Sequence, residues 1–165
     1  MGNTFPREII IEVSKKTALI YPENESHSLA SLLVEKVFEL TATQLMLNEQ
    51  VEITKENSDL LEQSIERLLK NEPIQHILGE AEFYGRKFRV NGDVLIPRQE
   101  TEELIKLIVD ENELDVPKIL DIGTGSGCIA CSLALEIRSA QVQAIDISEE
   151  ALITAQRNAD LLHAK

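Results

Sequence analysis

The stretch Asp121-Ile122-Gly123-Thr124-Gly125-Ser126-Gly127 constrains the fold of this chain more than any other. It lies between the short run Lys118-Ile119-Leu120 and a helix-forming segment that ends near Glu136. Glycines at alternate positions permit backbone angles and close approaches that a Cβ atom would block. A glycine loop between a strand and a helix is typical of the ligand-binding turn of a parallel α/β sheet.

The residues after Pro117 alternate between strand and helix patterns. We predict a short buried strand over 119–122, a helix over 126–136, a strand over 142–145 and a helix capped by Ser148. Gly127 would let the first of these helices pack near the strand. The order predicts a right-handed β-α-β unit that opens a doubly wound sheet.

Two carboxylates flank the loop and indicate its ligand. Asp146 ends the second predicted strand, where a carboxylate can accept hydrogen bonds from a ribose diol. Asp121 precedes the first glycine, where it would repel a pyrophosphate and attract an ammonium group. S-adenosylmethionine carries an ammonium group and a ribose diol but no phosphate, so we favour it as the cofactor. A nicotinamide cofactor, which prefers the spacing G-x-G-x-x-G, and a simple tight turn with a capping aspartate are the alternatives.

The first half of the chain carries helical periodicity. We predict helices over 5–21, 28–40 and 41–48, and a fourth that follows Thr54 as N-cap and stops at Asn71-Glu72-Pro73. These segments predict an all-α helical bundle over 1–79.

A hairpin signal separates the two halves. Asn91-Gly92 is a strong turn signal, and apolar residues flank it on both sides: Phe83, Phe88 and Val90 before, Val94-Leu95-Ile96 after. Pro97 ends this segment, and a helix is predicted to begin near Arg98. The expected fold class is therefore α/β, with a helical domain over 1–79, a β-hairpin linker over 80–97, and the first β-α-β-α part of a Rossmann-like sheet over 98–165.

Composition narrows the classes of partner. The 165 residues carry a formal net charge of −13, and a surface of that sign repels phosphate backbones. We therefore expect no direct nucleic-acid binding. No apolar run approaches the length of a membrane span, and the first residues lack the pattern of a signal peptide, so we expect a cytoplasmic protein without membrane contact.

The two cysteines form a C-x-x-C pair, Cys128 and Cys131. Zinc would need two further ligands, and His163 is the only candidate close in sequence. Both cysteines fall in a predicted buried helix, where cysteine acts as a small apolar residue. The three histidines, His27, His76 and His163, show no metal-ligand spacing, so we expect no metal site.

Several separate motifs occur in one order along the chain. They are Glu72-Pro73-Ile74-Gln75-His76-Ile77-Leu78-Gly79, Glu82-Phe83-Tyr84-Gly85, Val94-Leu95-Ile96-Pro97-Arg98-Gln99-Glu100-Thr101-Glu102 and the glycine loop. Together they resemble the release-factor glutamine N5-methyltransferase family over roughly residues 28–163.

This resemblance implies a helical domain that recognises a protein substrate and a class I methyltransferase domain that uses S-adenosylmethionine. The implied reaction is methylation of the glutamine side-chain amide in the Gly-Gly-Gln loop of peptide-chain release factors. On this sequence, the cofactor's methionine end would lie against Gly123, Thr124, Gly125, Ser126 and Gly127, and Asp146 would hold its ribose. The resemblance also places three residues of the segment over 96–101 beside the cofactor: Arg98, Glu100 and Thr101. Gln99 stands where the family usually has proline.

One family signature is missing. The catalytic Asn-Pro-Pro-Tyr motif, which positions a weakly nucleophilic amide, does not occur, and none of the five prolines is adjacent to another. We therefore expect no catalytic residue in this chain, which we interpret as a fragment of a longer enzyme that is inactive alone. Two parallel strands would have unpaired edges, which predicts self-association or a poorly ordered C-terminal half.

Two other functions remain open on the sequence alone. Nucleic-acid N6-adenine methyltransferases use a similar signature but need a positive groove, for which the chain offers Arg86, Lys87, Arg89 and Arg98. The helical segment could also act as a non-catalytic protein-binding module.

Overall fold

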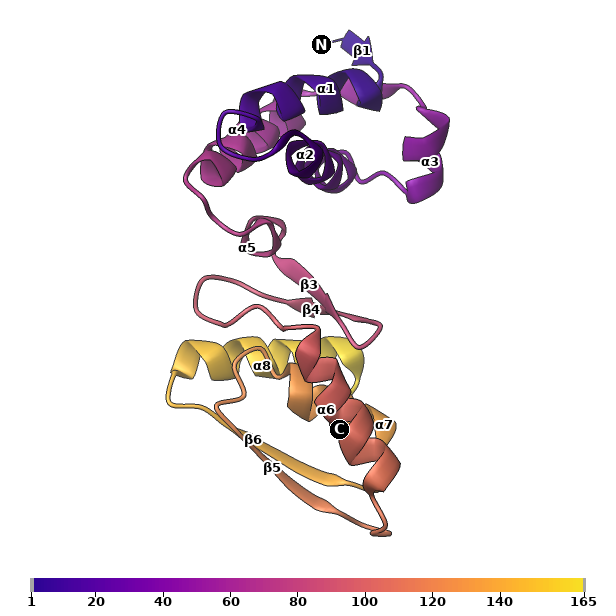
Figure 1. Cartoon of the computed structure of the whole chain (residues 1–165), viewed down its shortest axis with the longest axis vertical. Helices are drawn as coiled ribbons and strands as arrows, with labels where there is room; N and C mark the ends of the chain where they lie inside the picture. The colour runs from indigo at the N-terminus through magenta and orange to yellow at the C-terminus, as the bar shows by residue number, and fades with distance from the viewer. Residues whose placement is uncertain (1, 165) are drawn as a thin grey trace. The chain divides into compact units, whose positions relative to one another are not determined.

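The computed structural model describes residues 2–164 and divides the chain into two compact units, Met1–Leu78 and Gly79–Lys165 (Figure 1). The first unit is helical, and the second combines a hairpin with a parallel β-α-β-α segment. This confirms the predicted fold class. None of the helices in residues 2–164 is long and apolar enough to cross a membrane.

The first unit packs its helices around one apolar core. Its elements are β1 (Gly2–Thr4), α1 (Pro6–Thr17), α2 (Glu23–Val37), α3 (Ala42–Leu47), β2 (Val51–Ile53), α4 (Lys55–Leu69) and α5 (Ile74–Leu78). Residues at helical spacing on α1, α2 and α4 form the core, including Ile9, Val13, Leu33, Val34, Ile65 and Leu68. Thr54 caps α4 as predicted, because its Oγ1 accepts the Asn57 N–H and the Asn57 side chain accepts the Thr54 N–H.

Several boundaries in this unit differ from the prediction. Helix α2 begins at Glu23, five residues before the predicted start at Ser28, because Pro22 suits a helix flank and Glu23 and Glu25 favour the first turn. It ends at Val37, because Glu39 takes a φ of 51° that no helix continues through. Two elements were not predicted from the sequence: the short antiparallel β1–β2 ladder and helix α5.

The hairpin forms at a different turn from the one predicted. Strands β3 (Glu80–Phe83) and β4 (Arg86–Arg89) pair antiparallel, and Tyr84-Gly85 connects them with φ values of 49° and 68°. Two positive φ values match the twist of a two-residue hairpin, so Tyr84-Gly85 takes the turn. A turn does form at Asn91-Gly92, where the Val94 N–H donates to the Asn91 carbonyl at 3.3 Å and the Asn91 side chain accepts the Asp93 N–H. The hairpin predicted around this turn is wrong, because residues 94–96 form no strand.

The hairpin contributes to the core of the second unit. Phe83 and Phe88 are fully buried and pack edge to face, with ring centroids 6.0 Å apart. They cluster with Ile105 of helix α6 (Glu100–Glu111) and Leu133 of helix α7 (Cys128–Glu136). Helix α6 begins at Glu100, two residues after the predicted start at Arg98. The division into a linker over 80–97 and a domain over 98–165 stays a prediction.

Strand β5 (Lys118–Ile122), helix α7, strand β6 (Gln141–Ile145) and helix α8 (Glu149–Leu162) form the predicted β-α-β-α segment. The two strands pair in parallel, with Ile119 opposite Val142. Both helices lie on one side of the strands (Figure 1), where Ile119 packs into the core.

The opposite face of this sheet is open within the second unit. Leu120, Ile122 and Ile145 are 53%, 73% and 48% exposed. The prediction of a buried strand over 119–122 is therefore wrong for one face: side chains alternate across a strand, and the described residues of this unit cover only the helix side.

Gly127 lies at the start of α7 in tight contact with α8. Its φ is 77°, and a Cβ added there would lie 3.0 Å from the Cβ of Ala155. A close approach exists at this glycine, and the nearest atoms to the added Cβ belong to Ala155 of helix α8.

We predict that Gly127→Ala lowers the free energy of unfolding by about 2 kcal/mol, because it adds a strained φ and an overlap with Ala155. Gly92→Ala is the matched control: no heavy atom lies within 4 Å of its Cβ position and its φ is not positive, so its effect stays within about 0.5 kcal/mol. Urea unfolding followed by circular dichroism measures both. Equal stability of the two variants would contradict the packing of Gly127 on α8.

Candidate cofactor site

The glycine loop is folded back onto the end of strand β6. The N–H groups of Gly123 and Thr124 both donate to the Ile145 carbonyl, at 2.8 and 3.1 Å. The Gly127 N–H donates to the Thr124 carbonyl at 2.9 Å and closes the turn. These bonds fix the loop where the carboxyl ends of the two parallel strands meet, which is where ligands bind in sheets of this type.

Asp146 follows β6 and holds the loop from its side chain. One carboxylate oxygen accepts the Gly125 N–H at 2.8 Å, and the other accepts the Ser148 N–H at 3.0 Å. These backbone donors, that of Ser148 most, lower the pKa of the Asp146 carboxyl. The carboxylate therefore stays ionised to a lower pH than it would without these donors. A carboxylate has about four acceptor positions, so capacity remains for ligand hydroxyls.

Asp121 is fixed at the other end of the loop. Its Oδ2 accepts a hydrogen bond from the Thr124 hydroxyl at 2.7 Å, and Thr124 is buried. Between the two carboxylates, a Cβ added at Gly123 or Gly125 would meet no heavy atom within 4 Å. The structure thus brings together Asp121, the first two glycines and Asp146 around an open backbone surface. Their role as cofactor ligands stays a prediction.

Ser126 and Gly127 lie on the side of the loop that faces helix α8. Ser126 is 2% exposed, and its carbonyl oxygen accepts a hydrogen bond from the Asn158 side chain. Gly127 faces Ala155 of α8. Both residues were predicted to lie against the cofactor, and the structure places them on the inner side of the loop, where they set its shape.

The remaining candidates, Arg98, Glu100 and Thr101, lie at the start of α6. Within residues 2–164 no hydrogen bond joins them to the glycine loop. The segment before them is anchored nearby: Ile96 packs on the cluster of Val90, Val94 and Ala151. Ala151 lies in the first turn of α8, and Asp146 lies just before that turn in the chain. This packing therefore brings Ile96 to the same end of α8 as Asp146.

Asn158 supports the glycine loop and was not predicted as a site residue. It is fully buried, its Nδ2 donates to the carbonyls of Arg89 and Ser126, and its Oδ1 accepts the Arg89 N–H. The available signal was a polar residue one turn beyond Ala155 on the apolar side of a predicted helix. Helical periodicity alone does not tell what such a residue contacts.

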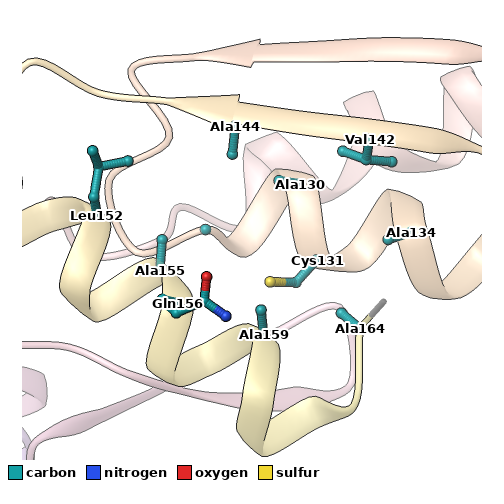
Figure 2. Close-up of a pocket in the computed structure, with 11 residues that line it drawn as sticks. Ala130, Cys131, Ala134, Val142, Ala144, Leu152, Ala155, Gln156, Ala159 and Ala164 are labelled. Atoms are coloured by element: carbon teal, nitrogen blue, oxygen red, sulfur yellow. The ribbon is translucent and has the colours of Figure 1, made fainter.

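A cavity of about 460 Å³ lies between α7, β6 and α8 (Figure 2). Small apolar side chains line most of it, among them Ala130, Ala134, Ala144, Ala155 and Ala159. Neither Asp121 nor Asp146 reaches it. This space has few polar groups to orient a ligand, so it offers less to a polar cofactor than the surface between Asp121 and Asp146.

The two cysteines of the C-x-x-C pair are unpaired thiols. Burial raises the pKa of Cys131 to about 11, and burial also raises the pKa of Cys128. Among residues 2–164 no group of three or more potential ligands could hold a metal ion. The pair therefore fits the predicted packing role.

We predict that Cys131 reacts with a thiol-specific reagent at pH 7 at least about a hundredfold more slowly than free cysteine, because the thiolate is the reactive form. In denaturant its rate should rise to that of the free amino acid. Reagent kinetics on a Cys128→Ser variant isolates this residue. A fast reaction in the native state would contradict the buried thiol and reopen a redox role.

Two family models match the chain on either side of the hairpin segment. The model described as PrmC N-terminal domain matches residues 11–79, and the model described as methyltransferase domain matches residues 115–165. The first covers α1 from Ile11 onward and helices α2 to α5, and the second covers the glycine loop and Asp146.

Three curated relatives share the description release factor glutamine methyltransferase. The protein of Bacteroides thetaiotaomicron is 48% identical over 88% of this chain and 52% of its own length. Those of Flavobacterium psychrophilum and Chlorobaculum tepidum are 46% and 39% identical over 87% and 92% of this chain, and 52% and 54% of their own lengths. The chain spans about half the length of these relatives. With its N-terminal helical domain and the start of a methyltransferase domain, the chain belongs to the release factor glutamine methyltransferase family.

Proposed function

We propose that this chain carries the S-adenosylmethionine site of a protein-glutamine methyltransferase. The observation that supports it best is the open glycine backbone between two carboxylates, Asp121 and Asp146. Asp146 would accept hydrogen bonds from the ribose diol, and Asp121 would face the ammonium of the methionine moiety. When bound, S-adenosylmethionine supplies an electrophilic methyl group on a sulfonium.

The loop's own hydrogen bonds disfavour a nicotinamide cofactor. A pyrophosphate needs free backbone N–H groups at the glycine loop. Here the N–H groups of Gly123, Thr124 and Gly125 already donate to the Ile145 carbonyl and the Asp146 carboxylate. A phosphate would also lie beside two negative side chains. A ligand with a positive end and hydroxyl groups fits these surroundings better.

The reaction that we propose for the whole protein is methylation of the glutamine amide in the Gly-Gly-Gln loop of a peptide-chain release factor. The relatives named for this activity are about twice as long as this chain. The family's Asn-Pro-Pro-Tyr signature does not occur in these 165 residues. We therefore assign cofactor binding to this chain and the positioning of the acceptor amide to sequence outside it.

Nucleic acid is the weaker alternative as substrate. Two of the basic residues on the hairpin are paired with carboxylates: Arg86 with Glu136, and Lys87 with Glu80. Arg86 also lies over the Tyr84 ring. Combined with a net charge of −13, this pairing leaves little positive surface to attract a phosphate backbone.

The helical unit supports recognition of a protein. A groove of about 400 Å³ lies among α1, α2 and α3, with apolar Ile10, Ile11, Leu45 and Met46 beside charged Arg7 and Glu35. Met46 is 71% exposed and Ile11 is 52% exposed. We propose that the release factor docks on this unit. The two unpaired thiols fit a reducing cytoplasm, where release factors act.

We predict that the chain binds S-adenosylmethionine and that Asp146→Asn weakens binding at least about tenfold, because the neutral amide loses charge-assisted hydrogen bonds. Asp110→Asn, an exposed change of equal charge on α6, is the matched control and should leave affinity unchanged. Isothermal titration calorimetry with S-adenosylmethionine and with NAD measures both. Tighter binding of NAD, or equal loss in the two variants, would contradict the assignment.

We also propose that the chain associates with itself through the open face of β5 and β6. Ile122 and Ile145 are register partners and form an exposed apolar pair on this face. Light scattering should show association that rises with concentration, and Ile122→Lys should shift the chain toward monomer. Leu107→Lys, at a 52% exposed position on α6, should not. A wild-type chain that stays monomeric at several hundred micromolar would refute this proposal.

A further inference from the structure

Three separated segments meet at one buried side chain in the second unit. Asn158 lies on α8, Arg89 ends strand β4 of the hairpin, and Ser126 belongs to the glycine loop. The Asn158 side chain bonds to the backbone of both other residues, at 2.7 to 2.9 Å. It is fully buried. No water can replace these contacts without opening the interface between the segments.

We call the three hydrogen bonds that join Asn158 to Arg89 and Ser126 the Asn158 clamp. The Asn158 Oδ1 accepts the Arg89 N–H, and its Nδ2 donates one hydrogen to the Arg89 carbonyl. The Asn158 amide thus satisfies both backbone groups of Arg89, as a neighbouring strand would at the edge of β4. The second Nδ2 hydrogen goes to the Ser126 carbonyl, so both donors are used. An amide is required, because only a group with one acceptor and two donors satisfies all three partners.

The clamp joins the two elements that carry the candidate site. Ser126 is flanked by Gly125, whose N–H donates to Asp146, and by Gly127, which packs on Ala155. Arg89 is followed by the segment that leads through Val90, Val94 and Ile96 to Arg98. The first turn of α8 packs on that segment through Ala151, so α8 contacts both elements along its length.

We propose that Asn158 is a positioning residue, which holds the glycine loop and the hairpin segment at the spacing that the cofactor requires. This inference rests on the proposed function, since it assigns the cofactor to the loop. Asn158 itself does not touch the ligand surface; it acts through the Ser126 carbonyl on the loop and through Arg89 on the hairpin.

The decisive variant is Asn158→Asp, which keeps shape and size. Its Oδ1 can still accept the Arg89 N–H, but a carboxylate oxygen would face the carbonyls of Arg89 and Ser126 where an N–H stood. The donor half of the clamp is lost and replaced by repulsion. Ile105→Ala is the control for general destabilisation: it removes buried volume from the same unit without a hydrogen bond to loop or hairpin.

The experiment uses the whole 165-residue chain and two readouts. Amide hydrogen exchange by NMR reports protection at Gly123, Thr124 and Gly127, whose N–H groups are bonded within the loop. Titration calorimetry reports S-adenosylmethionine affinity. In Asn158→Asp we expect at least tenfold faster exchange at these amides and at least tenfold weaker binding. In Ile105→Ala, at similar loss of melting temperature, both values should stay within threefold of wild type.

Other outcomes would contradict specific parts of the proposal. Loop amides that stay protected in Asn158→Asp would overturn the clamp. Faster exchange with unchanged affinity would overturn its link to the cofactor, as would an equal loss of affinity in Ile105→Ala. A wild-type chain that does not bind S-adenosylmethionine would contradict the proposed function for this chain, and the exchange of the loop amides would still decide on the clamp.

Discussion

The Ile145 carbonyl and the Asp146 carboxylate, side by side at the end of β6, determine the shape of the candidate site. The first accepts the N–H groups of Gly123 and Thr124, and the second accepts that of Gly125. Both depend on the parallel register that brings the end of β5 level with the end of β6. A one-residue slip in this register would move Asp146 away from the loop and point each strand side chain to the other face.

These hydrogen bonds also narrow the ligand chemistry. Loops that cradle phosphates present unpaired N–H groups, whereas here the N–H groups of Gly123, Thr124 and Gly125 donate to the Ile145 carbonyl and the Asp146 carboxylate, and a carboxylate lies at each end of the loop. Hydrogen bonds from backbone N–H groups lower the pKa of Asp146 and so favour its charged form. The site therefore suits a ligand with a cationic end and a diol. The match to a methyltransferase domain implies S-adenosylmethionine use in the family, and the cofactor that we propose for this loop is the same.

Local patterns in the sequence predicted the β-α-β-α segment, because strand, loop and helix there are each encoded by neighbouring residues. The glycine loop, Asp146 and the Ser148 cap were found this way. The position of the hairpin turn was not predicted correctly, because the sequence contains two dipeptides with turn propensity, Tyr84-Gly85 and Asn91-Gly92. Pairing of Phe83 and Phe88 inside the core favours the first. The role of Asn158 could not be predicted from local patterns, because its hydrogen-bond partners lie 69 and 32 positions away along the chain.

The central claim is that the glycine loop and Asp146 bind S-adenosylmethionine. An NMR titration of the isotopically labelled chain tests it directly, because each backbone amide reports its own surroundings. We expect saturable shifts that concentrate at residues 121–127 and at Asp146, and little change in the helical unit over 2–78. Shifts that avoid the loop, or equal shifts on addition of NAD, would contradict the claim.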